Sequence, residues 1–164
     1  MAETSIRPTL HFTYRHPAHF IAFGGGIGLI PFAPGTFGTL LALPLFHLLQ
    51  PLLAPWTFLG LILALFWLGA WACAVTGRAL GAADHGGMVW DEVVAFLLVL
   101  FFVPVDGYWQ GFAFLLFRLF DIFKPPPIRY YDRTLKNGFG VMWDDLIAAA
   151  YALLVIAVVY SLIG

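Results

Sequence analysis

The sequence predicts an all-α fold, a polytopic membrane helical bundle with about four to five transmembrane or membrane-embedded helices. Of its 164 residues, 62% are hydrophobic and 10% are charged, and the mean hydropathy is +0.90. These values lie far outside the range of soluble globular proteins. A chain of this length cannot bury so much apolar surface in a core of its own, so the lipid bilayer must cover the remainder. The length fits a single integral-membrane domain, residues 1–164.

Charge and cysteine content exclude several classes of protein. The formal net charge is −1 and the isoelectric point is near 6.5, so the chain has no overall field to attract nucleic acid. Cys73 is the single cysteine, which excludes both a disulfide framework and a cysteine-based metal site. We therefore expect lipid as the main surrounding partner and no nucleic-acid partner.

The N-terminal segment 5–23 mixes aromatic residues, histidines and arginines, which is typical of a segment at the membrane interface. We expect its three histidines, His11, His16 and His19, to be solvated there. Their loose spacing and the lack of an acidic partner argue against a metal site.

A glycine- and proline-rich stretch, FGGGIGLIPFAPGTFGTL, occupies residues 23–40. Pro31 and Pro34 break a helix here, and the glycines weaken any regular structure. Irregular backbone inside a membrane is stable only where protein or a watery cavity satisfies its amides. We expect a re-entrant or interfacial segment, and the pattern leaves open whether residues 23–38 enter the bilayer.

Five apolar segments follow or overlap this stretch, and several are shorter than the roughly 20 residues that a bilayer core requires. The last of them is the most uniformly apolar. Their approximate bounds are 39–53, 56–75, 89–103, 109–123 and 146–163.

The distribution of charge predicts the orientation of these segments. With the N-terminus inside and five spans, every Lys and Arg falls on or near the inner side, and the outer turns QPLLAP and PVDGY hold none. We therefore expect a multi-pass protein of a cytoplasmic membrane with this charged face toward the cytoplasm. The same threading leaves Asp106 outside and brings seven acids to the inner side: Asp84, Asp91, Glu92, Asp121, Asp132, Asp144 and Asp145.

These acids occur at three helix ends that could converge in a compact bundle. Asp91 and Glu92 begin the third segment, and Asp144 and Asp145 begin the fifth. Each pair has a simpler interpretation, because an acid near a helix N-terminus stabilises it by about 0.3–1 kcal/mol.

Asp121 is harder to explain, because it lies near the C-terminal end of its helix, where the dipole disfavours an anion. Arg118 and Lys124 lie three residues to either side and could form a structural ion pair with it. However, an ionisable group within a membrane span is costly and usually marks a functional site.

The acid-rich inner face indicates a metal site. Nearby cations are too few to neutralise five carboxylates, and oxygen ligands without cysteine or a histidine cluster favour Mg²⁺ or Mn²⁺ over zinc. We expect the following residues to supply metal ligands and the general base, with the individual roles left open: Asp91, Glu92, Asp121, Asp144 and Asp145.

Basic residues next to the acids suit a phosphate group. Lys124, Arg129 and Arg118 are the expected donors, although Lys124 and Arg129 also fit a simple positive-inside anchor. The Lys-Pro-Pro-Pro sequence at 124–127 predicts a stiff, extended exit from the helix. Gly35 and Thr36 precede a helix whose amides would point toward a phosphate.

Metal-binding acids, phosphate-binding bases and a membrane location together favour hydrolysis on a phospholipid headgroup by metal-assisted attack of water. The sequence lacks a Cys-x5-Arg loop, an Asp-x-Asp pair and the signature of membrane alcohol phosphotransferases. Alternatives are a metal-dependent hydrolase or transferase of another phospholipid, a transporter subunit whose acids line an ion path, and a purely structural subunit.

Four blocks, in order along the chain, resemble the bacterial phosphatidylglycerophosphatase A family: GLIPFAPGTFGTL, DHGGMVWDE, FRLFDIFKPPPIRYYDR and GFGVMWDDLIAA. The resemblance implies an Mg²⁺-dependent phosphatase of the bacterial inner membrane. Such an enzyme converts phosphatidylglycerophosphate to phosphatidylglycerol and phosphate in phospholipid biosynthesis, with its active site toward the cytoplasm. Ile27 and Thr39 depart from the small polar residue and the serine expected at their positions. The resemblance carries site roles over to Asp91, Glu92, Asp121, Lys124, Asp144 and Asp145.

Overall fold

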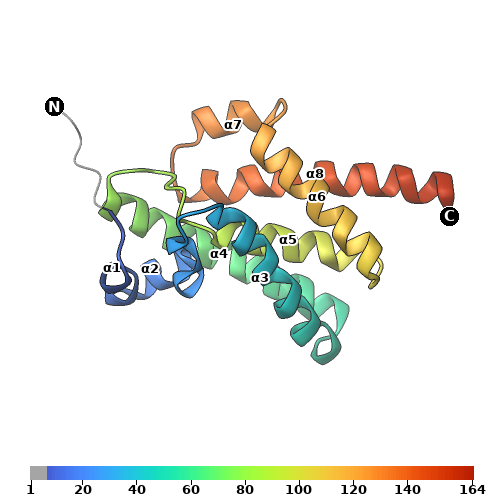
Figure 1. The fold of residues 1–164 in the computed structure, drawn as a ribbon, viewed down its shortest axis with the longest axis horizontal. Coiled ribbons are helices and arrows are strands. Elements are labelled where there is room, and N and C mark those ends of the chain that lie inside the picture. The colour runs from blue at the N-terminus through green and yellow to red at the C-terminus, as the bar shows by residue number, and fades with distance from the viewer. Residues whose placement is uncertain (1–6) are drawn as a thin grey trace.

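The computed structural model describes residues 7–164. The first six residues of the predicted domain, with the start of the predicted interfacial segment, lie outside this part. The described residues form helices and no strands, which confirms the all-α class (Figure 1). The α-helices are α1 (Leu10–Arg15), α2 (Pro17–Ala22), α3 (Pro34–Leu49), α4 (Pro55–Leu80), α5 (Trp90–Phe102), α6 (Gly107–Phe123), α7 (Ile128–Thr134) and α8 (Gly138–Ile163).

Each of the five predicted apolar segments overlaps one of the helices α3, α4, α5, α6 and α8. The largest boundary error concerns α8, which begins at Gly138 and not near Leu146. The Asn137 side chain caps this helix by accepting a hydrogen bond from the Gly140 amide at 2.8 Å. Asp144 and Asp145 therefore lie inside α8. The predicted segment began only after these acids, where the apolar run starts, and so it began too late.

Three stretches are long and apolar enough to cross a membrane: Pro34–Leu52, α4 and α8. The last two have 26 residues each, which at about 1.5 Å per residue exceeds the hydrocarbon thickness of about 30 Å. Between 22% and 39% of each apolar window is buried within the bundle. Most of that surface, including Leu63, Trp67 and Leu154, therefore faces outward, as expected for contact with lipid.

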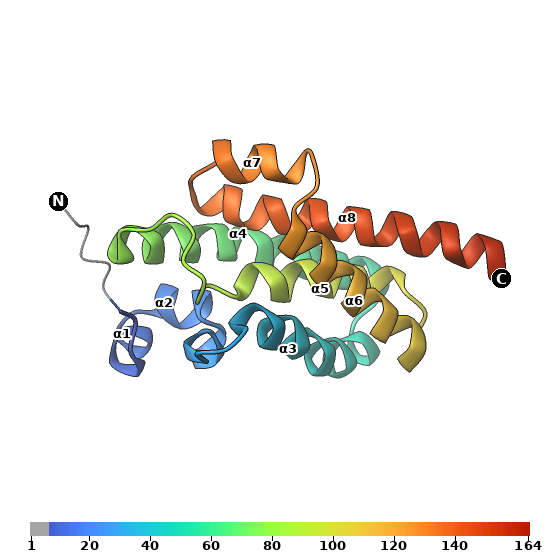
Figure 2. The same ribbon diagram turned by 45° about the horizontal axis from the view of Figure 1, so that its top comes forward.

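Helix α5 is the central helix of the bundle. It packs against α3, α4 and α8 and lies between α3 and α8 in Figure 2. Its 13 residues extend only about 20 Å, too short to span a bilayer alone. Side chains on all sides of it are buried, including Val93, Phe96, Leu97 and Leu100. The predicted segment 89–103 is thus a core helix, and the acids in its first turn lie inside the protein.

The glycine-rich stretch forms a 3₁₀ segment, Gly24–Leu29, in which Gly24, Gly25 and Gly26 have positive φ angles. It follows α1 and α2 at the end of the bundle where α5 begins (Figure 1). In this region the expectation of solvated histidines is wrong for His19. Its ring is 3% exposed and stacks on Phe12 with ring centroids 4.1 Å apart, because the turn between α1 and α2 folds the two residues together.

The expected extended exit after Lys124 is only three prolines long. Helix α7 begins directly after them at Ile128 and packs along the N-terminal half of α8 (Figure 2). The Tyr151 hydroxyl on α8 donates a hydrogen bond to the Pro126 carbonyl at 2.6 Å. The proline segment therefore returns the chain onto α8.

Candidate metal and phosphate site

The first turn of α5 is held in place from two sides. The Trp90 indole donates to the Leu65 carbonyl of α4 at 3.1 Å, and the Val89 amide donates to the Ala22 carbonyl at 2.8 Å. Helix α3 passes so close that a Cβ on Gly38 would lie 2.7 Å from the Cβ of Val89. These contacts fix the backbone that carries Asp91 and Glu92.

Asp145 comes from α8, whose start lies tightly against α4. A side chain on Gly138 would collide with the Ala70 carbonyl and the backbone of Ala74, so glycine permits this close approach. Asp145 lies seven residues further along, which returns it to the same face two turns later. A helix dipole acts mainly within the first turn, so it does not explain an acid at this depth.

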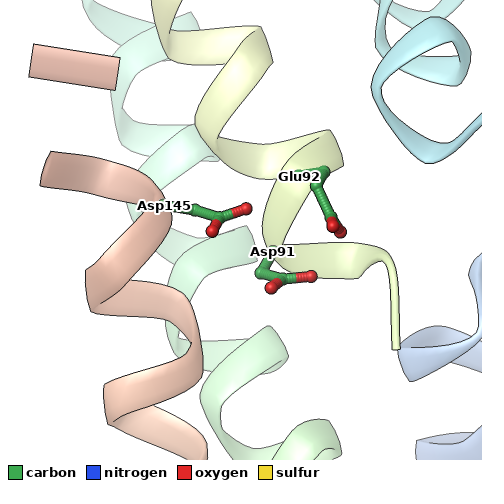
Figure 3. A group of neighbouring side chains, drawn as sticks. All are labelled: Asp91, Glu92 and Asp145. Carbon is green, nitrogen blue, oxygen red and sulfur yellow. The ribbon is translucent and has the colours of Figure 1, made fainter. Parts of the chain in front are cut away.

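The carboxylates of Asp91, Glu92 and Asp145, hereafter the acid trio, form a compact group. Asp145 projects from α8 toward the start of α5 (Figure 3), and ligand oxygens of the three residues lie within 4.8 Å of one another. Asp91 is 6% and Asp145 4% exposed. One oxygen of each has no hydrogen-bond partner: Asp91 Oδ1, Glu92 Oε2 and Asp145 Oδ2.

Three buried carboxylates at this distance repel one another and have lost their hydration. A divalent cation would compensate for both effects. The donors are hard oxygen atoms, which suits Mg²⁺ or Mn²⁺. The acid trio could therefore hold a metal ion, and the choice of Mg²⁺ or Mn²⁺ stays a prediction.

Arg118 of α6 connects the acid trio with Asp121. Its Nη1 lies 3.7 Å from Glu92 Oε1 and donates to Asp121 Oδ2, while its Nε is buried without a partner. Asp121 therefore forms the ion pair with Arg118 that the sequence left open, and it adjoins the acid trio through that arginine.

Lys124 pairs with Asp132 and not with Asp121, with Nζ 2.8 Å from Oδ1. The cause is local, because Lys124 adopts a left-handed conformation (φ 46°) that ends α6 and turns the chain toward α7. Burial acts to raise the pKa of Asp132, but the hydrogen bond and charge of Lys124 outweigh it and lower that pKa.

Asp144 lies near the pair formed by Lys124 and Asp132 and does not belong to the acid trio. It is 5% exposed, its Oδ1 lacks a hydrogen-bond partner, and one residue of helix turns it about 100° away from Asp145. Contact with Asp144 is one of the smaller effects on the pKa of Asp132. The pKa of Asp84 is raised, first by desolvation and then by the nearby Asp132 and Asp121, against the opposing charge of Lys124.

Asp84 and Asp132 were not among the predicted site residues. The charge threading had placed both at the inner face, and Asp132 follows Lys124 by eight residues in the same charged stretch. The ion pair of Asp132 with Lys124 depends on α7 folding back, which no local pattern indicated.

The other residues predicted to bind phosphate are Gly35, Thr36 and Arg129, and only Gly35 contacts residues of the site. Gly35 abuts the site, but the Thr36 amide donates to the Ala33 carbonyl at 3.0 Å. The Thr39 hydroxyl donates to the Gly35 carbonyl at 2.8 Å. Arg129 is exposed on α7 and donates to the Phe123 carbonyl at 3.4 Å.

Gly35→Ala is expected to lower activity at least about tenfold, because a Cβ there would lie 2.6 Å from Glu92 Oε1 and 3.2 Å from Arg118 Nη2. The matched control is Gly111→Ala, a helical glycine with nothing within 4 Å of the added carbon. Initial rates of phosphate release from both variants test this contact. Equal rates would show that the close approach of α3 is irrelevant to the site.

Fold and site together define a helical membrane protein with a cluster of carboxylates that could hold a metal ion and a largely buried arginine beside it. A family model described as Phosphatidylglycerophosphatase A matches residues 20–160. The chain belongs to the phosphatidylglycerophosphatase A family, as its four sequence blocks predicted.

Curated relatives cover most of the chain. It is 44% identical to phosphatidylglycerophosphatase A of Haemophilus influenzae, over 93% of this chain and 94% of the relative. It is 39% identical to the Escherichia coli protein of the same name, over 81% and 77% of the two chains. A Bacteroides thetaiotaomicron protein, provisionally named a phosphatidylinositol-3-phosphatase, is 38% identical over 88% and 94%. No solved structure matches the chain.

Proposed function

We propose that the protein hydrolyses phosphatidylglycerophosphate to phosphatidylglycerol and phosphate in bacterial phospholipid biosynthesis, with Mg²⁺ as cofactor. Family membership makes the chain an enzyme of the phosphatidylglycerophosphatase class. The observation that carries the proposal is the acid trio, whose buried oxygens lack partners beside the buried guanidinium of Arg118.

In the proposed mechanism, Asp91, Glu92 and Asp145 would hold the metal. When bound, Mg²⁺ would supply Lewis-acid polarisation of a phosphoryl oxygen and lower the pKa of bound water. A carboxylate of the site takes the proton from the attacking water. Asp121 and Asp144 lie outside the acid trio and are available either as that base or to position Arg118 and Lys124.

Arg118 and Lys124 are the proposed principal donors to the phosphate. The guanidinium of Arg118 presents several N–H groups in one plane, which suits a tetrahedral phosphate. Gly35 in the first turn of α3 lies against Glu92 and Arg118, and Thr36, the next residue, is proposed to contact the phosphate from the same turn. Arg129, exposed on α7, binds at the headgroup level outside the buried acids.

The distribution of basic residues supports a multi-pass arrangement with the site toward the cytoplasm. The acids at the start of α5, near the end of α6 and in the first turns of α8 lie close together, with Arg118 between Glu92 and Asp121. An ion path would instead require charges through the depth of the membrane, so this gathering favours an enzyme over a transporter subunit.

Lys124→Met is expected to raise KM about tenfold with little change in stability. Its partner Asp132 is partly exposed (26%), and such a pair contributes at most about 1 kcal/mol. KM and thermal unfolding of the purified protein provide the two readings. A large loss of stability with unchanged KM would assign Lys124 a structural role and remove it from the phosphate site.

A substrate panel tests the proposed activity against its nearest alternative. Purified protein with Mg²⁺ is given phosphatidylglycerophosphate, phosphatidylinositol 3-phosphate and phosphatidate in matched detergent micelles, and phosphate release is measured. The proposal requires the highest kcat/KM on phosphatidylglycerophosphate. A preference for phosphatidylinositol 3-phosphate, the activity in the provisional name of one relative, would replace the proposed substrate.

A further inference from the structure

Gly69, buried in α4, lies where this helix contacts both of the helices that carry the acid trio. A Cβ at this position would lie 2.5 Å from Cδ1 of Trp90 on α5 and 2.7 Å from Sδ of Met142 on α8. Both distances are too short for non-bonded heavy atoms. The packing of α5 and α8 against α4 therefore requires that position 69 has no side chain.

The two neighbours of Gly69 are close in sequence to acids of the trio. Trp90 directly precedes Asp91, and Met142 lies three residues before Asp145, about one helical turn. The thioether of Met142 is flexible and can adjust to a new neighbour, whereas the indole of Trp90 is rigid. A side chain at position 69 would therefore displace mainly Trp90, and with it the first turn of α5.

The position of the Trp90 indole also depends on Gly69 through a hydrogen bond. The indole N–H donates to the Leu65 carbonyl at 3.1 Å, and Leu65 lies four residues before Gly69 in α4. A helical side chain covers the turn that precedes it, so a side chain at position 69 would lie over this carbonyl. The glycine leaves the second lone pair of the Leu65 oxygen open to the indole.

We propose that Gly69, acting through Trp90, is a positioning residue that sets the spacing of the acid trio for a small divalent cation. The inference rests on the proposed function, because it requires that the acid trio holds the metal. Mg²⁺ demands near-ideal octahedral geometry with oxygens at about 2.1 Å, whereas Ca²⁺ accepts oxygens at about 2.3–2.6 Å in a flexible arrangement. A shift of Asp91 relative to Asp145 therefore weakens the binding of Mg²⁺ more than that of Ca²⁺.

The test measures metal binding directly, without turnover. Purified, metal-depleted protein in detergent is titrated with Mg²⁺ and separately with Ca²⁺ by calorimetry. Gly69→Ala is compared with Gly60→Ala, a glycine of the same helix with nothing within 4 Å of the added carbon. We expect Gly69→Ala to weaken Mg²⁺ binding about tenfold, as is typical when a residue that orients a metal ligand is lost. Ca²⁺ binding is expected to weaken about threefold or less, and Gly60→Ala to bind both ions as the wild type does.

Trp90→Phe tests the same link without a new side chain at position 69, and it decides the question if Gly69→Ala does not fold. It keeps an aromatic ring but removes the N–H group that donates to Leu65. We expect it to lower the ratio of Mg²⁺ to Ca²⁺ affinity in the same direction as Gly69→Ala. Thermal unfolding in chelator shows that each variant is folded. A purely structural role of Gly69 would lower the unfolding temperature and leave the affinity ratio unchanged.

Asp145→Asn separates failure of this inference from failure of the proposed function. If the wild type binds neither ion, or if Asp145→Asn binds both as the wild type does, the acid trio is not the metal site and both proposals are wrong. If Mg²⁺ binding requires Asp145 but Gly69→Ala and Trp90→Phe keep the affinity ratio of the wild type, only the positioning role is wrong. An equal fall of the ratio in Gly60→Ala would also overturn it.

Discussion

Asp145→Asn is expected to reduce phosphate release from phosphatidylglycerophosphate by more than about 100-fold, since it removes one of three proposed metal ligands. The same change is expected to leave the unfolding temperature of the metal-free protein unchanged or higher. Asp145 is 4% exposed, and its Oδ2 has no hydrogen-bond partner. Removing one of three mutually repelling buried charges relieves the folded state.

Activity and thermal unfolding in chelator are measured on the same Asp145→Asn preparation. The matched control is Asp106→Asn. Asp106 caps the N-terminal end of α6, away from Asp121, by accepting a hydrogen bond from the Tyr108 amide at 3.0 Å. Asparagine caps a helix about as well as aspartate, so this variant retains activity. If Asp145→Asn were fully active, the acid trio would not be the metal site.

Arg118→Met is expected to abolish activity and to lower the free energy of unfolding by about 3 kcal/mol, since it leaves buried carboxylates without their cation. The side chains of Arg118 and Glu92 are only 14% and 12% exposed. Asp121 is paired with the same guanidinium. Denaturant unfolding gives the change in stability, and phosphate release gives the activity.

Arg129→Met is the stability control for Arg118→Met, because Arg129 is exposed and its one hydrogen bond is to the Phe123 carbonyl. We expect its stability to change by less than about 0.5 kcal/mol. Equal effects of the two substitutions on stability would mean that the buried ion pairs of Arg118 do not hold α5 and α6 together.

Hydropathy predicted the helices because their apolar faces meet lipid or core. It could not distinguish those two environments. The segment 89–103 has the composition of a span, but α5 is a 13-residue helix surrounded by α3, α4 and α8. Only the packing of the whole bundle shows that its first-turn acids are sealed inside.

The placement of Lys and Arg on the inner side predicted that the acids converge, but it did not predict which residues each acid contacts. Asp144 and Asp145 are adjacent in sequence, yet the helix turns Asp145 toward Asp91 and Asp144 toward the group that contains Asp132. Lys124 was expected near Asp121 from its spacing of three residues. The left-handed end of α6 redirects it, and such a backbone turn at a lysine has no clear signal in sequence.

The central claim is that the acid trio binds a divalent metal required for hydrolysis of phosphatidylglycerophosphate. The most direct test is phosphate release by the purified wild type with Mg²⁺, after chelation, and after Mg²⁺ is restored. We predict release with Mg²⁺, loss of nearly all release on chelation, and recovery on restoration. Release that continues undiminished in chelator, or no release at all from a folded wild type, would contradict the claim.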